Sequence, residues 1–446
     1  MIIRPSCFLT GTRGRIYMVA NQYTNAKLKL DIRGIRVSAG EILFYTGLIL
    51  WVTQEYINRT VFLNFFGGQF LTALRYFCML IFFIKILVTE KKLKMKAAAV
   101  FIVSAAVFVV VQSHIDVGMP LIQVLLLVYA ARSIPFKKIC KVLLWSCLTL
   151  WLIPVLVDKL GIYELPREVD KLRVREFLNF NYVSFGAIFF NNIVFCCLYA
   201  YTDPDLRGSG GNYAHRREVS WPVLAIFAAA LIWLFKITDT SLPFLVGMLY
   251  MILYVLAIKL RVLRIRNTLP ARLMAILIFP VLALVTYGIA AAYNWRVPWQ
   301  KKLDDMIHYR FSLAHQGIQK HGIHLLGSAM QENTDRTKGA YFYVDSGYMK
   351  NLLNFGVIVF VLILIMYSIM LYAAIVEHDT MLAIWLICVA IYSIFNNMLL
   401  SPKENGSLFA IWYAIDLLHW HRKKKTAGLR AARMAARRRI EYGTQS

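Results

Sequence analysis

Acidic residues are scarce in this sequence, and charged residues of either sign make up little of it. Asp and Glu number 24 against 50 Lys and Arg, and these four types reach only 17% of 446 residues. Soluble globular domains carry about 25% charged residues. Hydrophobic residues reach 59% instead. The composition excludes an ordinary water-soluble enzyme and predicts one polytopic membrane domain of the all-α class.

Motifs for disulfides, metals and export are missing as well. The seven cysteines form no CxxC pair, and none lies in a long loop. The histidines between residues 308 and 324 lack the HExxH spacing of a zinc site. We therefore expect no disulfide outside the membrane, no metal site and no cofactor. The first forty residues have no apolar core followed by a small-residue cleavage site, so no removable signal peptide is expected.

Long apolar runs bounded by charged residues fill most of the sequence. Runs of roughly 17 to 25 residues have the length that an α-helix needs to cross a bilayer. Twelve membrane-spanning helices are predicted, near residues 41–57, 69–88, 97–113, 117–132, 140–157, 180–201, 220–237, 242–260, 271–293, 350–374, 381–399 and 406–420. An even number places both termini on the same side of the membrane.

The basic connections between these runs decide the predicted orientation. The segments richest in Lys and Arg are the first forty residues, 91–96, 132–138, 207–217, 259–266 and the tail 421–446. Cytoplasmic flanks of membrane helices carry such an excess of Lys and Arg. The protein is therefore predicted to span the plasma membrane with both termini on the cytoplasmic side. The net charge of +26 is assigned to contact with anionic lipid rather than to nucleic acid. Residues 1–420 then form the transmembrane domain, with a basic tail after it.

Two sizeable loops remain on the predicted outer side, at residues 158–179 and 294–349. The first holds Arg167, Arg173 and Arg175 among acidic residues, a pattern that usually forms a salt-paired, solvated surface. The second loop is longer and concentrates the polar residues of the outer side. Any chemistry is therefore expected at the outer face.

A helix is predicted over residues 304–321 of the second loop. The segment lacks Pro, begins with acidic residues and ends with Lys, His and Gly, which are typical start and stop signals. One face of this helix would carry Arg310, Ala314, Gly317 and His321, two small residues between two cationic ones. Either this face lets a phosphate or sugar approach the backbone, or it lets a neighbouring helix pack closely.

Polar residues also stand at the start of the next apolar run and inside the membrane. Asp345 is interpreted either as a helix cap or as a carboxylate that deprotonates a sugar hydroxyl, and Tyr348 either as an interfacial anchor or as a substrate contact. Arg75 lies inside a predicted span, where an Arg is costly and marks a functional site by default. Glu55 is its candidate structural partner. Helix-to-helix hydrogen bonds are expected from Asn191, Asn192, Asn396 and Asn397.

The second loop resembles that of a known family. LDDMIHYRFSLAHQGIQKHGIHLLG at 303–327, followed by YVDSGYMKNLLNFGVIVF at 343–360, is similar to the large outer loop of Wzy-type polysaccharide polymerases, especially those of Gram-positive capsule and exopolysaccharide clusters. Arg310 stands where that family has the Arg that opens the loop helix. HGIHLLG matches the family's "yGi.l.G" turn, and Asp345 with Tyr348 matches its D-N/S-x-Y element.

The resemblance implies a GT-C-like fold of about twelve transmembrane helices and a metal-independent glycosyltransferase. Such enzymes move a growing glycan from undecaprenyl pyrophosphate onto the sugar of an incoming lipid-linked repeat unit, at the outer face and without a nucleotide sugar. The implied partners are these lipid-linked repeats, membrane lipid, and the flippase and chain-length regulator of the same pathway. Nucleic acid is not among them.

Cations placed where charge develops on the leaving pyrophosphate are the expected catalytic device, and Arg suits this role because its planar fork grips phosphate oxygens. The expected catalytic residues are Arg310 together with Asp345 or His315, either of which would take the proton of the acceptor hydroxyl. The expected substrate-binding residues are Arg173, Arg175, Arg75, His321 and Tyr348.

The sequence departs from the family pattern in two places, and other functions stay open. REFLNFNYVSFG at 175–186 has Asn179 where the family's R-x-x-x-G-F has Gly, and TDTSLPFL at 238–245 lacks the Arg of an S-R-T start. One alternative is a flippase or exporter of lipid-linked oligosaccharide, although no internal repeat typical of transporters is found. Another is a ligase that transfers finished glycan. The third, a metal-dependent glycosyltransferase, would need acids that NRTVFLNFFGG at 58–68 lacks.

Overall fold

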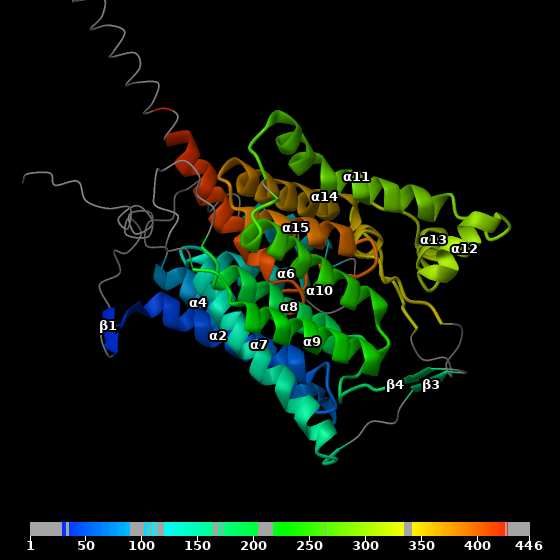
Figure 1. The fold of residues 1–446 in the computed structure, drawn as a ribbon, viewed down its shortest axis with the longest axis horizontal. Helices are drawn as coiled ribbons and strands as arrows, with labels where there is room; N and C mark the ends of the chain where they lie inside the picture. Colours follow the sequence, from blue (N-terminus) through cyan, green and yellow to red (C-terminus); the bar gives the residue numbers. More distant parts are fainter. Residues whose placement is uncertain are drawn as a thin grey trace, which may run out of the picture.

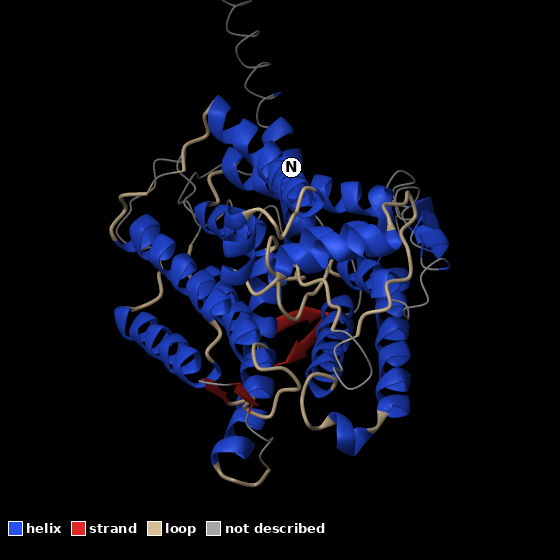
Figure 2. Ribbon diagram, turned by 90° about the vertical axis from the view of Figure 1, so that its right-hand side faces the viewer, coloured by secondary structure: helices blue, strands red, loops and turns tan. Residues whose placement is uncertain are grey.

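Helices make up most of the chain that the computed structural model describes (Figure 2). The described residues are 29–32, 35–89, 102–103, 105–107, 109–111, 113, 120–163, 168–170, 173–203, 217–263, 265–333, 341–423 and 426. The predictions for the first 28 residues, for the basic segments 91–96 and 207–216, for most of the predicted helix 97–113 and for most of the tail 421–446 lie outside these residues.

The described helices are numbered in chain order. In chain order they are α2 (Ala39–Ile57), α3 (Leu63–Phe66), α4 (Gly68–Thr89), α6 (Pro120–Ala130), α7 (Phe136–Lys159), α8 (Phe185–Ala200), α9 (Trp221–Thr238), α10 (Ser241–Tyr254) with a π-helical end (Val255–Lys259), α11 (Leu269–Ala291), α12 (Pro298–Met306), α13 (Arg310–His321), α14 (Gly347–Val376) and α15 (Thr380–Tyr392). A 3₁₀ turn (Gly406–Phe409) leads into a last helix over 410–423.

Two antiparallel hairpins are the strands of the described chain. β1 (Lys29–Ile32) pairs with β2 (Ile35–Ser38), and β3 (Glu168–Asp170) pairs with β4 (Arg173–Arg175). Figure 1 shows β1 at one end of the bundle and the β3–β4 hairpin, α12 and α13 at the opposite end. We call the end that carries α12, α13 and the β3–β4 hairpin the loop end, and the other the tail end.

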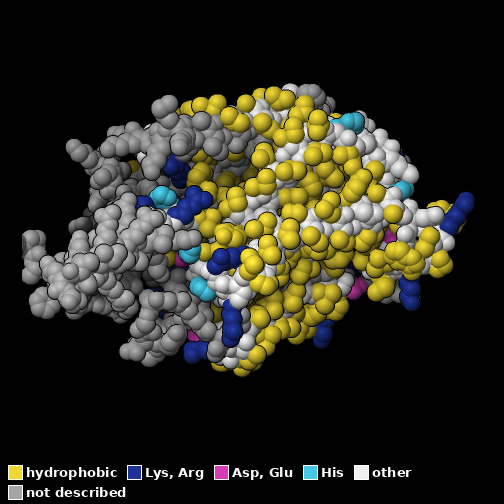
Figure 3. All heavy atoms as spheres, turned by 90° about the horizontal axis from the view of Figure 1, so that it is seen from above, with side chains coloured by type: hydrophobic (Ala, Val, Ile, Leu, Met, Phe, Trp, Pro, Cys, Tyr) yellow, Lys and Arg dark blue, Asp and Glu magenta, His cyan; other side chains and the backbone are white. Residues whose placement is uncertain are grey.

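Six helices of the described chain are long and apolar enough to cross a membrane, namely α4, α7, α9, α10 with its π-helical end, α11 and α14. The apolar helices α6, α8 and α15 are shorter. Figure 3 shows a broad band of hydrophobic side chains across one face of the bundle, with Lys and Arg on either side of it. The helical fold class agrees with the sequence, and these helices support a membrane protein. The twelve predicted crossings and the side of the termini stay predictions.

The shorter helices α8 and α15 form the centre of the bundle. Nearly every residue of both is buried, as expected for helices that are hydrophobic all round. Asparagines in this centre bond to neighbouring backbone, since Asn191 Nδ2 donates to Pro243 O at 2.7 Å and Asn192 Nδ2 to Lys403 O at 2.9 Å. The predicted helix-to-helix bond is therefore confirmed for Asn191, which bonds to α10, whereas Asn192 bonds to the non-helical segment around Lys403.

Two glycines fasten the HLLG turn of the second loop to a break in α14. Gly356 lies inside α14 with φ 77° and ψ 173°, so the helix is interrupted there. The N–H groups of Val357 and Ile358, freed by the break, donate to His324 O at 3.1 Å and Leu325 O at 3.2 Å. Gly327, at φ 84°, lies against Gly356 so closely that a Cβ on Gly356 would stand 2.2 Å from the Gly327 nitrogen. The turn therefore replaces the missing helical partners of α14.

We expect Gly356→Ala to destabilise the protein by about 1–3 kcal/mol or more, since a Cβ is disfavoured at this φ and would collide with backbone atoms. Gly288→Ala on α11 is the matched control, because no atom lies within 4 Å of its Cβ position. Thermal unfolding in detergent measures both. An unfolding temperature of Gly356→Ala equal to that of the control would mean that the break is not required.

Candidate functional site

Arg310 and Asp345 form a charged pair at the loop end. Arg310 is the first residue of α13, and Asp345 stands two residues before α14. Arg310 Nε lies 3.6 Å from Asp345 Oδ2, and about one fifth of each side chain is exposed (18% and 20%). This distance is longer than a hydrogen bond. Within the described chain, Arg310 Nε and Nη1 have no hydrogen-bond partner, so the guanidinium keeps donors for a ligand.

A break between α12 and α13 places Arg310 at a helix start. His308 and Tyr309 have φ of 58° and 62°, which ends α12. Asp304 Oδ1 then accepts hydrogen bonds from Phe311 N at 2.8 Å and from Ser312 N at 3.2 Å, which caps α13. The single helix predicted over 304–321 is therefore corrected to two helices. Asp304 does cap a helix N-terminus, as predicted, but the helix that it caps is α13, while Asp304 itself lies in α12.

The small residues of α13 serve packing. Ala314 is fully buried, and a Cβ on Gly317 would stand 2.9 Å from Leu353 Cδ1 of α14. Of the two interpretations of this face, close packing of a neighbouring helix is correct. Approach of a phosphate to the backbone between Arg310 and His321 is excluded, because protein atoms already fill that space.

Asp345 is free for chemistry because its neighbour provides the helix cap. Ser346 is the N-cap of α14, and its Oγ accepts from Met349 N at 3.4 Å. Gly347 N donates to Ser393 O at 2.9 Å, which holds this helix start against the end of α15. The interpretation of Asp345 as a cap is therefore wrong. Tyr348 is fully buried and its hydroxyl donates to Ala390 O at 2.8 Å, so it fixes the helix start and does not face a substrate.

The surroundings of Asp345 favour its neutral form more than water does. Burial raises the pKa of Asp345, and the charges of Arg310 and Lys350 only partly oppose this. Lys350 is itself paired, with its Nζ 2.7 Å from Glu332 Oε2. A carboxylate with a raised pKa is a stronger base than an ordinary Asp. Asp345 thus combines partial exposure, a cationic neighbour and increased basicity.

Tyr182 and Arg175 extend the site toward the β3–β4 hairpin. Tyr182, just before α8, is 49% exposed as a whole residue. Partial desolvation of its hydroxyl nevertheless raises its pKa, and Asp345 contributes in the same direction. Arg310 and Arg175 oppose this shift, so Asp345, Arg310 and Arg175 each lie within electrostatic reach of Tyr182. Arg175 Nε is 4.0 Å from Asp239 Oδ2, as the salt-paired interpretation of this loop predicts. The side chain of Arg173 lies outside the described residues.

A second charged cluster, which sequence reasoning missed in part, lies deeper at the same end. It contains Arg75 and Glu55, as expected, and also Arg59, Lys403 and Glu404. Lys403 Nζ bonds to Glu55 Oε2, and both side chains are nearly buried. The signal in the sequence was SPKEN at 401–405, where a Lys and a Glu interrupt two apolar runs. We call these five residues the inner cluster.

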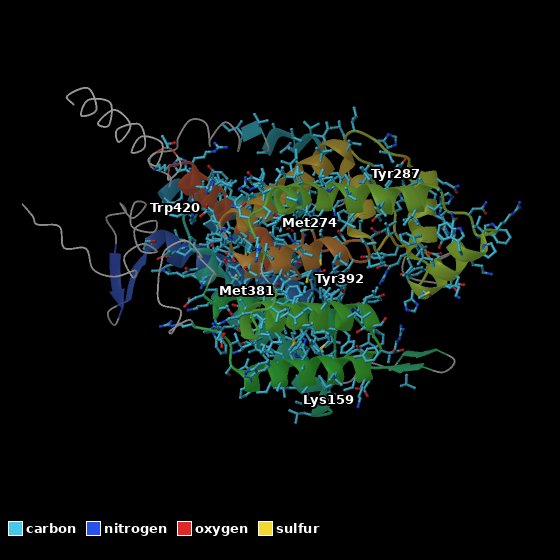
Figure 4. All side chains as sticks on the ribbon, turned by 45° about the horizontal axis from the view of Figure 1, so that its top comes forward. Lys159, Met274, Tyr287, Met381, Tyr392 and Trp420 are labelled. Carbon is cyan, nitrogen blue, oxygen red and sulfur yellow. The ribbon has the colours of Figure 1, made fainter. Side chains whose placement is uncertain are left out.

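Tyr392 connects the two groups of charges. It lies within electrostatic reach of Arg310 and Asp345 on one side and of Glu404 on the other. In Figure 4 it is labelled at the end of α15 nearer to α12 and α13, while Met381 marks the other end of that helix. Tyr392 therefore lies between the Arg310–Asp345 pair and the inner cluster.

Comparisons of the chain with family models, with curated proteins and with solved structures give no match. Among the described residues, no group of three or more His, Cys, Asp or Glu side chains is placed to hold a metal ion. What the region offers is guanidinium donors for an oxyanion and one basic carboxylate beside them.

The structure does not bring the predicted histidines to the pair. His315 uses both ring nitrogens, with Nδ1 2.8 Å from Ala290 O and Nε2 2.7 Å from Gln319 Nε2. It therefore links α13 to the end of α11. His321 lies at the far end of α13, stacked on Phe342 with ring centroids 5.9 Å apart. Burial lowers the pKa of His321, and Lys320 lowers it further, so it is mainly neutral at pH 7.

Proposed function

We propose that this protein is a polysaccharide polymerase, a glycosyltransferase that joins undecaprenyl-pyrophosphate-linked repeat units at the outer face of the plasma membrane. The observation that carries the proposal is the Arg310–Asp345 pair, in which unpaired guanidinium donors stand beside a carboxylate of raised pKa. Both residues lie in the segments that resemble the loop of Wzy-type polymerases. The long apolar helices favour a place in the membrane, where a lipid-linked substrate also lies.

Each member of the pair has a distinct role in the proposed reaction. The acceptor hydroxyl oxygen attacks the anomeric carbon of the donor glycan while its proton passes to Asp345. The bond between that carbon and the pyrophosphate oxygen breaks, and its electron pair leaves with the pyrophosphate. Arg310 stabilises the charge that develops on this leaving group. Cleavage of the bond between the sugar and the pyrophosphate supplies the driving force, so no nucleotide sugar enters the reaction.

The orientation of the bundle supports an outer location for this site. Lys137 and Lys138 begin α7 and Lys259 ends the π-helical segment after α10, all at the tail end. Basic residues at one end of membrane helices favour the cytoplasm. The loop end then faces outward, where a flippase delivers lipid-linked repeats.

The direct test is polymerisation in liposomes. Purified protein receives its lipid-linked single repeat in the presence of EDTA and without nucleotide sugar, and the products are separated on a gel. We expect a ladder of multiples of the repeat. Liposomes that carry the Arg310→Gln variant are the control. Absence of a ladder with the wild-type protein, under conditions where it binds the lipid, would overturn the proposal.

A lipid-linked oligosaccharide flippase is the second candidate. The observation in its favour is the inner cluster, since transporters carry charged residues that face the interior of the bundle. The same liposomes distinguish the two functions when the repeat is fluorescent and a membrane-impermeant quencher is added. Movement of the repeat between leaflets without any ladder would establish the flippase.

The proposed base predicts the pH dependence of the reaction. Asp345 must be ionised to accept a proton, so activity is lost as the pH falls through its pKa. Because burial raises that pKa, we expect the acidic limb of the rate profile above the ordinary Asp value of about 4. Initial rates of ladder formation at constant ionic strength measure this limb. A limb at or below the ordinary value would exclude Asp345 as the base.

A further inference from the structure

The inner cluster brings three cations together from three separate parts of the chain. Glu55 lies within electrostatic reach of Lys403, Arg59 and Arg75, and Glu404 within reach of Lys403, Arg59 and Glu55. Lys403 is neutralised by its bond to Glu55. Arg59 and Arg75 then remain, with Glu404 as the other carboxylate of the cluster, and Glu404 lies within electrostatic reach of Arg59. The cluster therefore keeps an excess of positive charge among buried and half-buried side chains, which is costly unless an anion binds there.

Close packing fixes the two helices that carry the first part of the cluster. α2 and α4 run antiparallel, with Gly40 against Thr89 and Gly47 against Phe82. This register brings Glu55 level with Arg75. Arg75 is seven residues after the start of α4, roughly 10 Å from the loop end of that helix.

Hydrogen bonds to the backbone fix the segments that carry the other two cations, Arg59 and Lys403. Asn181 N donates to Arg59 O at 2.9 Å, which ties the turn after α2 to the segment before α8. Asn192 of α8 holds the Lys403 segment, with its Nδ2 bonded to Lys403 O and its Oδ1 accepting from Gly406 N at 2.9 Å. The cluster is therefore preorganised and does not depend on flexible side-chain placement alone.

The two arginines present donors that the described protein leaves unused. The guanidinium of Arg59 lies over the Phe185 ring with its Cζ 5.0 Å from the centroid, so one face is occupied. Its Nε, and the Nε of Arg75, are buried and have no hydrogen-bond partner among the residues that the structure describes. Stacked guanidinium groups bind phosphate through the edge that carries the N–H donors. These edges fit a phosphate oxyanion.

An open hollow lies on α4 beside this cluster. It is shallow and open to the outside, and it is lined by five exposed residues of this one helix, Gly68, Gln69, Thr72, Ala73 and Tyr76. The rings of Phe66 and Phe70 stack next to it, with centroids 5.6 Å apart, and both are exposed. Since α4 is one of the apolar helices long enough to cross a membrane, the hollow lies where lipid chains run. A ligand with a phosphate and a long apolar chain matches both features.

We propose that Arg59, Arg75 and Lys403 form a second phosphate subsite, distinct from Arg310, for a polyprenyl pyrophosphate whose chain lies in the hollow on α4. The inference rests on the proposed function. In a polymerase, Arg310 holds the pyrophosphate that leaves the donor, and the second subsite holds the intact pyrophosphate of the acceptor repeat. Tyr392 then lies between the two lipid headgroups.

The test is the number of lipids bound. Protein in phosphatidylcholine nanodiscs receives undecaprenyl pyrophosphate, and native mass spectrometry counts the bound lipids. We expect two per wild-type chain, one for Arg310→Gln, one for the double variant Arg59→Gln and Arg75→Gln, and none when all three are replaced. Arg296→Gln is the matched control, an exposed Arg at the same end of the bundle that retains both lipids. Thermal unfolding verifies that each variant folds.

The outcomes separate the two proposals. No bound lipid in the wild-type protein would overturn the proposed function itself. One bound lipid that persists in the double variant would overturn the second subsite and leave the first. Loss of the second lipid when phosphatidylglycerol replaces phosphatidylcholine would show a general site for anionic headgroups and overturn the acceptor role.

A variant that keeps all the charges tests the hollow separately and does not disturb the cluster. We expect Ala73→Trp to weaken undecaprenyl pyrophosphate binding at the second subsite by roughly tenfold and to leave inorganic pyrophosphate binding unchanged. Equal affinity of Ala73→Trp and wild-type protein for the lipid would mean that the chain does not lie on α4. Arg75→Lys, which keeps the charge but not the fork, is expected to weaken both ligands.

Discussion

Arg310→Gln protein is expected to form the ladder of repeat multiples about 10²–10³-fold more slowly than the wild type, while it folds and inserts normally. The guanidinium has one charged partner, Asp345 at 3.6 Å, and two donors without a partner in the described chain. Its loss therefore removes little structure. What it removes is the positive charge at the leaving pyrophosphate.

The control for this variant is Lys301→Gln, which neutralises an exposed cation on the adjacent helix α12. We expect wild-type rates from it. Arg310→Lys keeps the charge without the planar fork and is expected to fall between the two. Ladder formation at the wild-type rate by Arg310→Gln would remove Arg310 from the catalytic site.

Asp345→Asn is expected to lower the rate by about 10²–10⁴-fold without weakening substrate binding. The amide has the shape of the carboxylate but cannot take the acceptor proton. Because Arg310 loses its counter-charge, the lipid pyrophosphate is expected to bind as tightly as before or more tightly. Initial rates and lipid binding, measured on the same preparation, separate the two effects.

Asp305→Asn on α12 provides the matched control, since this carboxylate is exposed and stands next to the buried cap Asp304. His315→Phe tests the alternative base. A loss of rate in His315→Phe as large as in Asp345→Asn, with an unchanged unfolding temperature, would transfer the base role to His315.

Arg310 and Asp345 could be singled out from the sequence because the segments that hold them resemble the loop of Wzy-type polymerases. Their placement at the starts of α13 and α14, side by side, comes from the fold. The predicted span 69–88 likewise corresponds to α4 (Gly68–Thr89), since hydropathy and length determine such a helix. Tyr348 was harder to interpret. A Tyr beside an apolar run is typical of an interface anchor, and only the fold shows its bond to Ala390 O.

The inner cluster was not predictable as a whole because no local pattern connects its members. Lys403 and Glu404 lie in an irregular segment between α15 and the last helix. Hydropathy predicts a span on either side of this segment and says nothing about the segment itself. Asn192 and Asn405 hold that segment through hydrogen bonds that have no sequence period. The break before α13 is hidden for a similar reason, since positive φ at His308 and Tyr309 occurs without the Gly or Asn that usually signals it.

The bond between Glu55 and Lys403 joins residues 348 positions apart, so the ribosome makes its two halves at very different times. Glu55, Arg59 and Arg75 emerge with the first helices, long before SPKEN is translated. Until then their charges have to be shielded by water, by lipid headgroups or by the insertion machinery. The inner cluster is therefore complete only once residue 403 has been made, and a chain shortened before that residue would leave Glu55 without its bond to Lys403.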